Sequence, residues 1–130
     1  MPTLFTKIIN GDIPSYKIAE DENYLAFLDV FPLKAGHTLV IPKIENDYIF
    51  DLDDALLAGL MIFAKKVALA MKKAVPCKRI GIAVIGLEVP HTHIHLIPME
   101  HVGDLNFANP KLQISADEMQ KIADRIKLNF

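Results

Sequence analysis

The first third of the chain consists of short apolar runs separated by turn residues. Residues 16–20, 24–30 and 37–42 are such runs, and turn clusters such as 10–14 (Asn-Gly-Asp-Ile-Pro) lie between them. Short runs bounded in this way are typical of β-strands. Because the connections between the runs are short, the pattern predicts an antiparallel meander. Residues 4–9 fit either a helical turn or an extended segment.

The middle of the chain has a long helical pattern. It predicts a helix from residue 53 to about residue 74, with acidic residues at its start, lysines in its second half and Pro76 after its end. The helix dipole favours this arrangement of charges. A stripe at helical spacing is expected to face the core: Leu57, Leu60, Ala64, Val67 and Met71. Leu56, Ile62 and Phe63 lie off this stripe, which predicts a second buried face on the helix.

The last part of the chain predicts two further strands and a helix. Residues 79–86 (Arg-Ile-Gly-Ile-Ala-Val-Ile-Gly) form the fourth apolar run, and residues 90–98 form a fifth. Residues 99–114 have the Gly, Asn and Pro content of a loop, and Ser115 with Glu118 forms a capping box for a last helix. We therefore expect an α+β fold in a single domain over residues 1–130. It would have a five-stranded antiparallel sheet, the long helix packed on the sheet, and a peripheral C-terminal helix.

The fifth run carries three histidines at alternate positions. His91, His93 and His95 lie between Pro90 and Pro98. A β-strand sends alternate side chains to opposite faces, so a strand would gather the three rings on one side, whereas a helix would spread them apart. Neighbouring imidazoles on a surface strand contribute nothing to folding, and charged ones repel each other. The spacing therefore favours a chemical site, either a metal centre or a nucleophile with supporting rings.

Composition narrows the class of protein. Hydrophobic residues make up 52 % of the 130 residues and charged residues 23 %, which is typical of a globular domain. The net charge of −2 argues against a nucleic-acid binder that works by neutralising phosphates. The single cysteine, Cys77, fits a reducing compartment. No secretory signal is visible at the start, and no apolar stretch approaches the ~20 residues that span a bilayer, so we expect a cytoplasmic protein with no membrane partner.

Several segments resemble one known family. The segment 91–97 resembles the histidine-triad motif of the HIT superfamily, in which apolar residues alternate with three histidines. Residues 36–43 (Gly-His-Thr-Leu-Val-Ile-Pro-Lys), preceded by residues 26–29 (Ala-Phe-Leu-Asp), resemble the nucleotide-binding segment of its Hint-like branch. Residues 4–9 with the following Ile-Pro pair resemble the opening of the family. The similarity covers most of residues 3–99 and leaves residues 100–130 as a C-terminal loop and helix.

The resemblance implies a function and assigns roles to residues. It implies hydrolysis at the α-phosphate of a purine nucleoside phosphoramidate, or of a related phosphoanhydride, without a metal or other cofactor. His93 matches the nucleophile that forms a nucleotidyl-histidine intermediate. His91 and His95 match the flanking histidines that orient it and contact phosphate, and His37 matches a fourth histidine that supports them. Asp29 matches a ribose-binding acid, although an aspartate there would also cap the turn before Pro32. Four residues match the apolar lining of a base pocket, with AMP as the typical ligand: Phe5, Ile8, Ile13 and Phe27.

The sequence also departs from the family pattern. The loop 86–90 before the triad is short and apolar, and Glu88 takes a place near the bound phosphate where the family commonly has a small hydroxyl residue. A carboxylate there repels phosphate unless it is protonated or paired. Two alternatives to efficient phosphoramidase activity follow, namely a nucleotide-binding protein with little turnover and a dinucleoside polyphosphate hydrolase. A third is a zinc site built from the triad, with His37 or His101 as a further ligand.

The branch that the chain resembles is typically homodimeric. The off-stripe residues Leu56, Ile62 and Phe63 would form an exposed apolar patch in a monomer, and Gly59 would allow close approach of a second helix. We therefore expect a homodimer whose interface includes the long helix and the fourth strand. The competing expectation is that the C-terminal helix covers this face within one chain.

Overall fold

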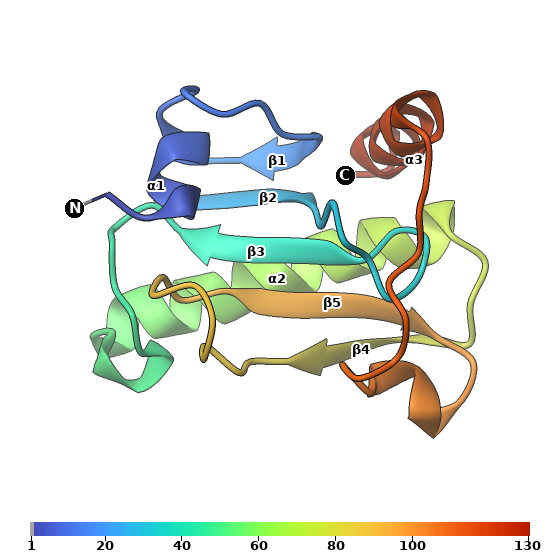
Figure 1. Cartoon of the computed structure of the whole chain (residues 1–130). Helices are drawn as coiled ribbons and strands as arrows, with labels where there is room; N and C mark the ends of the chain where they lie inside the picture. The colour runs from blue at the N-terminus through green and yellow to red at the C-terminus, as the bar shows by residue number, and fades with distance from the viewer. Residues whose placement is uncertain (1) are drawn as a thin grey trace.

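The computed structural model describes residues 2–130 and contains one sheet and three α-helices (Figure 1). The elements in chain order are α1 (Leu4–Ile9), β1 (Lys17–Glu20), β2 (Tyr24–Leu28), β3 (Thr38–Pro42), the 3₁₀ turn η1 (Ile49–Asp51), α2 (Asp54–Ala74), β4 (Arg79–Ala83), β5 (Ile94–Met99), the 3₁₀ turn η2 (Val102–Leu105) and α3 (Ala116–Leu128). The strand order is β1-β2-β3-β5-β4, and every neighbouring pair is antiparallel. The predicted α+β fold with a five-stranded antiparallel sheet is confirmed.

Both faces of the central strands are covered. Figure 1 shows α2 running behind the sheet. Ala26 and Leu28 of β2 belong to the large core on that face, whereas Leu25 and Phe27 belong to a smaller apolar cluster with Phe5 of α1 on the other face. All five residues of β2 are therefore buried. A strand covered on both faces reads as a continuous apolar run, which is why its sequence does not alternate.

The segment 4–9, which the pattern left undecided, is a helix of six residues. The hydroxyl of Thr3 accepts the backbone N–H of Thr6 at 3.0 Å and caps the helix. The Phe5 ring packs edge-on against Phe27 of β2, with ring centroids 5.6 Å apart. The short helix is therefore fixed by one cap and one buried aromatic residue, and it forms a wall over the front of the sheet.

The long helix has the predicted length, but two positions of its predicted second face are covered within the chain, whereas Ile62 of that face is 58 % exposed. Asp53 caps it by accepting the N–H of Leu56 at 2.8 Å. Phe63 is buried within the chain, tilted against Tyr24 at 5.6 Å and Phe130 at 5.9 Å between ring centroids. At Gly59 the Tyr24 hydroxyl occupies the space that a Cβ would need. The expectation that these two positions serve a second subunit is therefore wrong, because Tyr24 of β2 fills that space.

The C-terminal helix is part of the core and is not peripheral, so that expectation is corrected. Ser115 caps α3 through the N–H of Glu118 at 3.2 Å. Its apolar face joins the same buried cluster as α2 and the sheet, and that face consists of Met119, Ile122, Ala123 and Ile126. A complete apolar stripe at i, i+3, i+4 and i+7 needs a partner surface. The helix finds this surface beside β1, as Figure 1 shows.

The histidine segment is only partly a strand. β5 begins at Ile94, so His91 and His93 precede it. The preceding Pro90 has no N–H, and the N–H of Thr92 donates to the Asn46 carbonyl at 2.6 Å, outside any strand ladder. Strands β2 and β4 also end earlier than their apolar runs. Within residues 2–130, no helix combines the length and hydrophobicity that a bilayer crossing requires.

Candidate active site

Strand register gathers the polar residues on the front face of the sheet. Phe27 pairs with Leu39, and Leu39 pairs with His95, so these side chains form one row across β2, β3 and β5. Asp29 follows Phe27 by two residues and His37 precedes Leu39 by two. Because strand side chains alternate with period two, Asp29 and His37 form a second row beside the first. The backbone confirms the pairing, since the N–H of Asp29 donates to the His37 carbonyl at 2.9 Å.

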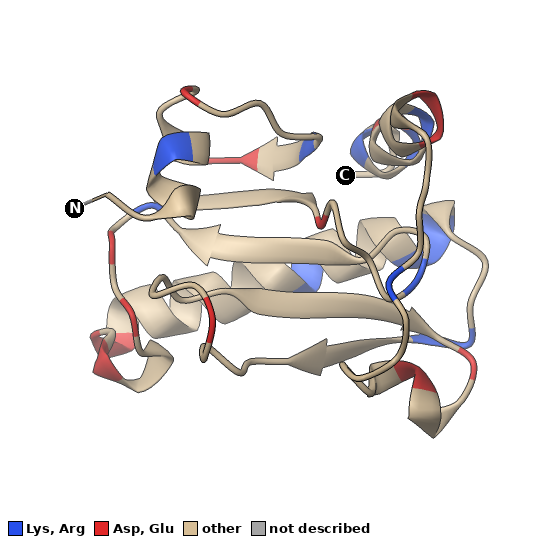
Figure 2. Ribbon diagram, in the orientation of Figure 1, with Lys and Arg blue, Asp and Glu red and all other residues tan. Residues whose placement is uncertain are grey.

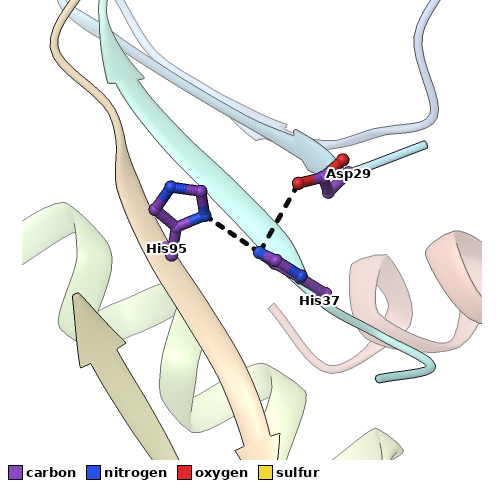
Figure 3. Close-up of side chains that lie close together, drawn as sticks. All are labelled: Asp29, His37 and His95. Atoms are coloured by element: carbon purple, nitrogen blue, oxygen red, sulfur yellow. Dashed lines mark hydrogen bonds and ion pairs between the residues drawn. The ribbon is translucent and has the colours of Figure 1, made fainter. Parts of the chain in front are cut away.

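Three side chains meet at this point, as Figure 3 shows. Nε2 of His37 lies 3.0 Å from Nδ1 of His95 and 3.5 Å from a carboxylate oxygen of Asp29. On its other side, Nδ1 of His37 accepts the backbone N–H of Leu33 at 3.0 Å. A backbone N–H can only donate, so Nδ1 of His37 holds a lone pair and the proton of the neutral ring is on Nε2.

The Nε2 proton of His37 determines the tautomer of His95. Nε2–H of His37 donates to Nδ1 of His95, which must therefore hold a lone pair, and the proton of neutral His95 is on Nε2. The backbone N–H of Leu33 thus determines, through two imidazoles, that His95 presents an N–H donor. A donor at this position suits an anionic oxygen.

His93 has the opposite tautomer to His37 and His95. Its Nδ1 lies 2.7 Å from the carbonyl oxygen of His91, which can only accept, so Nδ1 carries the proton. The lone pair of the neutral His93 ring is therefore on Nε2. Phe5 packs edge-on against this ring at 5.0 Å and His95 at 4.9 Å between centroids, which holds its orientation.

His91 does not lie with the residues that line the cavity. Its Nε2–H donates to the Pro42 carbonyl at 2.8 Å, and its Nδ1 accepts the Thr3 hydroxyl at 2.8 Å. The ring is fully buried. Since both nitrogens are bonded to the protein, the ring has no polar atom left for the phosphate contact that the family resemblance implied. What His91 supplies to the site is its carbonyl oxygen, which orients His93.

A cavity of about 540 Å³ opens in front of these histidines, and every residue predicted for the site except His91 lines it. One wall is apolar and comes from α1, the loop after it and β2, with Phe5, Ile8, Ile13 and Phe27. The exposed Glu88 lies on the loop before the triad. Cavities of roughly 300–1,000 Å³ with apolar walls and a few polar groups are typical of small-molecule sites.

Asp29 caps the turn after β2 and also lines the cavity. One carboxylate oxygen accepts the N–H of Phe31 at 2.8 Å and so caps the turn after β2. The other oxygen faces His37, and the side chain lines the cavity. Burial raises the pKa of Asp29, partly opposed by the hydrogen bond from Phe31. The turn therefore fixes the side chain while leaving one oxygen toward the ligand space.

His37, His95 and His91 are held neutral near pH 7. Burial, reinforced by the neighbouring His95, lowers the pKa of His37 to about 3. Burial and the nearby His93 lower the pKa of His95 to about 4, and burial also lowers the pKa of His91. Neutral rings can act as nucleophiles, donors and acceptors, but they contribute no positive charge.

A metal fits this cluster poorly. The ligand atoms of Asp29, His37 and His95 lie within 4.8 Å of one another and are of the type that zinc binds. A metal at Nε2 of His37 would move the ring proton to Nδ1, against the N–H of Leu33. His101 is exposed, caps η2 and does not line the cavity. Of the zinc ligands suggested by the sequence, His95 and His37 are grouped here, with Asp29 beside them in place of the other two triad histidines.

One part of the site was missed from the sequence. The segment 106–113, which we call the strap, connects η2 to α3 and crosses the front of the sheet (Figure 1). Phe107 packs edge-on against His95 at 4.7 Å between centroids, and the N–H of Leu112 donates to the Pro32 carbonyl at 2.8 Å. Phe107 and Lys111 of the strap both line the cavity. Nothing in its Asn- and Pro-rich sequence distinguishes it from an ordinary loop.

Comparison with known proteins gives a consistent result. A family model described as HIT domain matches residues 10–102. An uncharacterized HIT-like protein of Borreliella burgdorferi is 36 % identical over 135 residues, covering 98 % of this chain and 97 % of that protein. The adenosine 5′-monophosphoramidase of Schizosaccharomyces pombe is 35 % identical over 133 residues, covering 97 % and 96 %. The crystal structure of a HIT-like protein from Bartonella henselae superposes with a TM-score of 0.85 at 28 % identity, covering 98 % of this chain and 96 % of that one.

Proposed function

Because the chain belongs to the HIT domain family, we propose that it is a nucleotide hydrolase that uses His93 as a covalent nucleophile. The proposed substrate is a purine nucleoside phosphoramidate, or a related phosphoanhydride, attacked at the α-phosphate. The monophosphoramidase activity named for the Schizosaccharomyces pombe relative supports this choice of substrate.

The observation that carries the proposal is the tautomer of His93. Its Nδ1–H is engaged by the His91 carbonyl at 2.7 Å, so the lone pair of the neutral ring is on the other nitrogen, in a side chain that lines the cavity. A nucleophile must present a lone pair in a fixed direction, and a hydrogen bond to its second nitrogen achieves this. Neither His37 nor His95 combines these features, because their rings are bonded to each other.

The proposed reaction has two displacements. Nε2 of His93 forms a bond to the α-phosphorus, the phosphorus–nitrogen bond of the phosphoramidate breaks, and the amine leaves with the bonding pair and takes up a proton. Water then attacks the same phosphorus and gives up a proton, which balances the one taken up by the amine. The phosphorus–histidine bond breaks with its electron pair returning to Nε2 of His93, and the nucleoside monophosphate is released. Covalent catalysis divides one difficult displacement into two easier ones.

The other residues of the site are proposed to position the nucleotide. Nε2–H of His95 would donate to a phosphoryl oxygen, with its proton held in place by His37. The carboxylate oxygen of Asp29 that faces His37 would accept hydrogen bonds from the ribose hydroxyls. The apolar wall with Phe5 and Phe27 would hold the base, since aromatic and aliphatic side chains pack well against a purine.

A second candidate function is nucleotide binding with little turnover. It is favoured by the loop before the triad, where Leu87 is 88 % exposed and Glu88 puts a carboxylate at the cavity. A negative charge there opposes the build-up of charge on the transferring phosphoryl group. A measurement of turnover beside AMP affinity separates the two candidates.

The test combines activity with binding. In His93→Ala, turnover of adenosine phosphoramidate should be lost while AMP affinity, measured by calorimetry, stays close to that of the parent. His101→Ala is the matched control, because His101 does not line the cavity, and it should leave both quantities unchanged. Parent-level turnover in His93→Ala would rule out His93 as the nucleophile. AMP binding by a parent protein without turnover would favour the second candidate.

We also propose that the chain forms a homodimer through its β4 edge. β4 is an edge strand of the sheet; its first residue, Arg79, is exposed, and towards its end the exposed residues are apolar, with Ile82 47 % and Val84 beyond it 39 % exposed. A groove of about 210 Å³ lies beside it, with Met61 of α2 in its lining. An open apolar edge favours pairing with another strand, and a two-fold axis would bury this surface in both copies.

Sedimentation at micromolar concentration tests the dimer. Ile82→Lys should shift the protein from dimer to monomer, because it puts a charge into the proposed interface. Leu128→Lys on α3 is the control, since Leu128 is equally apolar, lies on another element and is 88 % exposed. A parent protein that sediments as a monomer would refute the dimer.

A further inference from the structure

The lining of the cavity has more acidic than basic side chains. Among the residues that the structure describes, Asp29 and Glu88 contribute carboxylates to its lining and Lys111 contributes the one Lys or Arg side chain. Figure 2 shows no Lys or Arg on β2, β3 or β5, so these three strands bring no positive charge to the cavity. The histidines do not compensate, since burial holds His37 and His95 neutral.

Lys111 is placed at this cavity by the strap. Its Nζ donates to the Phe107 carbonyl at 2.9 Å and lies 5.4 Å from the centroid of the Phe107 ring. The same ring packs against His95 at 4.7 Å, so the ammonium group is connected to the phosphate-facing histidine through one aromatic side chain. The field of Lys111 also acts on its neighbours in the cavity, because it opposes the rise that burial causes in the pKa of Asp29 and adds to the lowering that burial causes in the pKa of His95.

A nucleotide needs a positive charge in this place. A nucleoside monophosphate carries a doubly charged phosphate near pH 7, and transferring it from water to a cavity with two carboxylates is unfavourable without a cation. Hydrogen bonds from neutral groups satisfy part of this demand, and a charged donor is about twice as strong as a neutral one. The ammonium of Lys111 is held by a single carbonyl, from which its flexible stem allows it to turn toward a ligand.

We propose that Lys111 binds a phosphate of the nucleotide and makes the site selective for nucleotides over nucleosides. This inference rests on the proposed function, since it takes the cavity as a nucleotide site. It concerns a residue outside residues 10–102, the part of the chain that the HIT domain model matches. The strap is therefore a functional part of the site and not only a connection to α3.

Calorimetry with AMP and with adenosine tests the inference. Lys111→Met keeps the aliphatic stem on Phe107 and removes the charge, and it should weaken AMP binding by roughly 10- to 100-fold, the value of a charged hydrogen bond. Adenosine affinity and the melting temperature should not change. Lys111→Arg keeps the charge and should restore most of the AMP affinity.

Lys34→Met is the control for net charge. Lys34 pairs with Asp104 of η2 at 3.7 Å and does not line the cavity, so its replacement should leave AMP affinity unchanged. A parent protein that binds AMP, with the same affinity in Lys111→Met, would overturn the inference and leave the proposed function intact. Equal losses for AMP and adenosine would also overturn it, since they indicate a structural role. A parent protein that does not bind AMP would overturn the proposed function and this inference together.

Discussion

At the scale of single residues, the site is determined by where protons lie. The backbone N–H of Leu33 sets the proton of His37, which sets that of His95, while the carbonyl of His91 sets that of His93. Backbone groups cannot change their role as donor or acceptor, so they fix the tautomers of side chains that can. The spacing of the triad predicted that His93 and His95 act together. It could not predict these tautomers, because Leu33 and His37 lie far from the triad in the sequence.

The proposed ligand role of Asp29 can be tested apart from its role in the turn. Asp29→Asn keeps an oxygen that can accept the N–H of Phe31, but removes the charge that faces the cavity. We expect AMP binding to weaken by roughly 1–3 kcal/mol, the value of a charged hydrogen bond. The parent should bind AMP more tightly than 2′-deoxy-AMP, and Asp29→Asn should lose most of this preference. Equal affinities of the parent for both ligands would remove Asp29 from the ribose site.

At the scale of elements, tertiary contacts determine which helix faces are covered, and the local sequence pattern does not show this. Gly59 and Phe63 read as an exposed helix face, and the C-terminal helix read as an appendage, because sequence pattern shows that a face is apolar and not what covers it. Tyr24 of β2 covers the first, and the face of α3 joins the same core. Strap residue Lys111 was missed for a related reason. Its position in the cavity depends on Phe107 packing against His95, which comes earlier in the chain.

Gly59 provides a test of this packing. In an exposed helix position, replacing Gly by Ala stabilises by up to about 1 kcal/mol. At Gly59 the new Cβ would collide with the Tyr24 side chain, whose hydroxyl donates to the Leu56 carbonyl at 2.9 Å. Gly59→Ala should therefore lower the free energy of unfolding by roughly 1–3 kcal/mol, the usual cost of overpacking. Urea denaturation measures this, and a more stable variant would contradict the close approach of Tyr24 to α2.

At the scale of the whole molecule, the buried histidines connect the site to stability. Their pKa values are lowered from 6.5 to about 3 for His37 and about 4 for His95 in the folded chain. Below pH 6.5 the unfolded chain therefore binds more protons than the folded one, so acid favours unfolding. The fold that keeps these rings neutral for chemistry is stabilised by them above pH 6.5 and loses this contribution as the pH falls.

The free energy of unfolding should accordingly be level above about pH 6.5 and fall between about pH 6.5 and 4. Asp29 opposes this in part, because its raised pKa lets the folded state take up a proton first. His95→Gln should show a shallower fall than the parent. Denaturation at a series of pH values measures the profile. A level profile down to pH 4.5 would contradict neutral, buried imidazoles in the folded state.

The central claim is that His93 forms a covalent bond to the α-phosphate. The most direct measurement is intact-protein mass spectrometry, followed by peptide mapping, after the protein is mixed with adenosine phosphoramidate and the reaction is quenched rapidly without acid. The account predicts one adenylyl group per chain, on the peptide that contains His93, and none in His93→Ala. Turnover by the parent protein without any adduct, or an adduct on His37 or His95 instead, would contradict it.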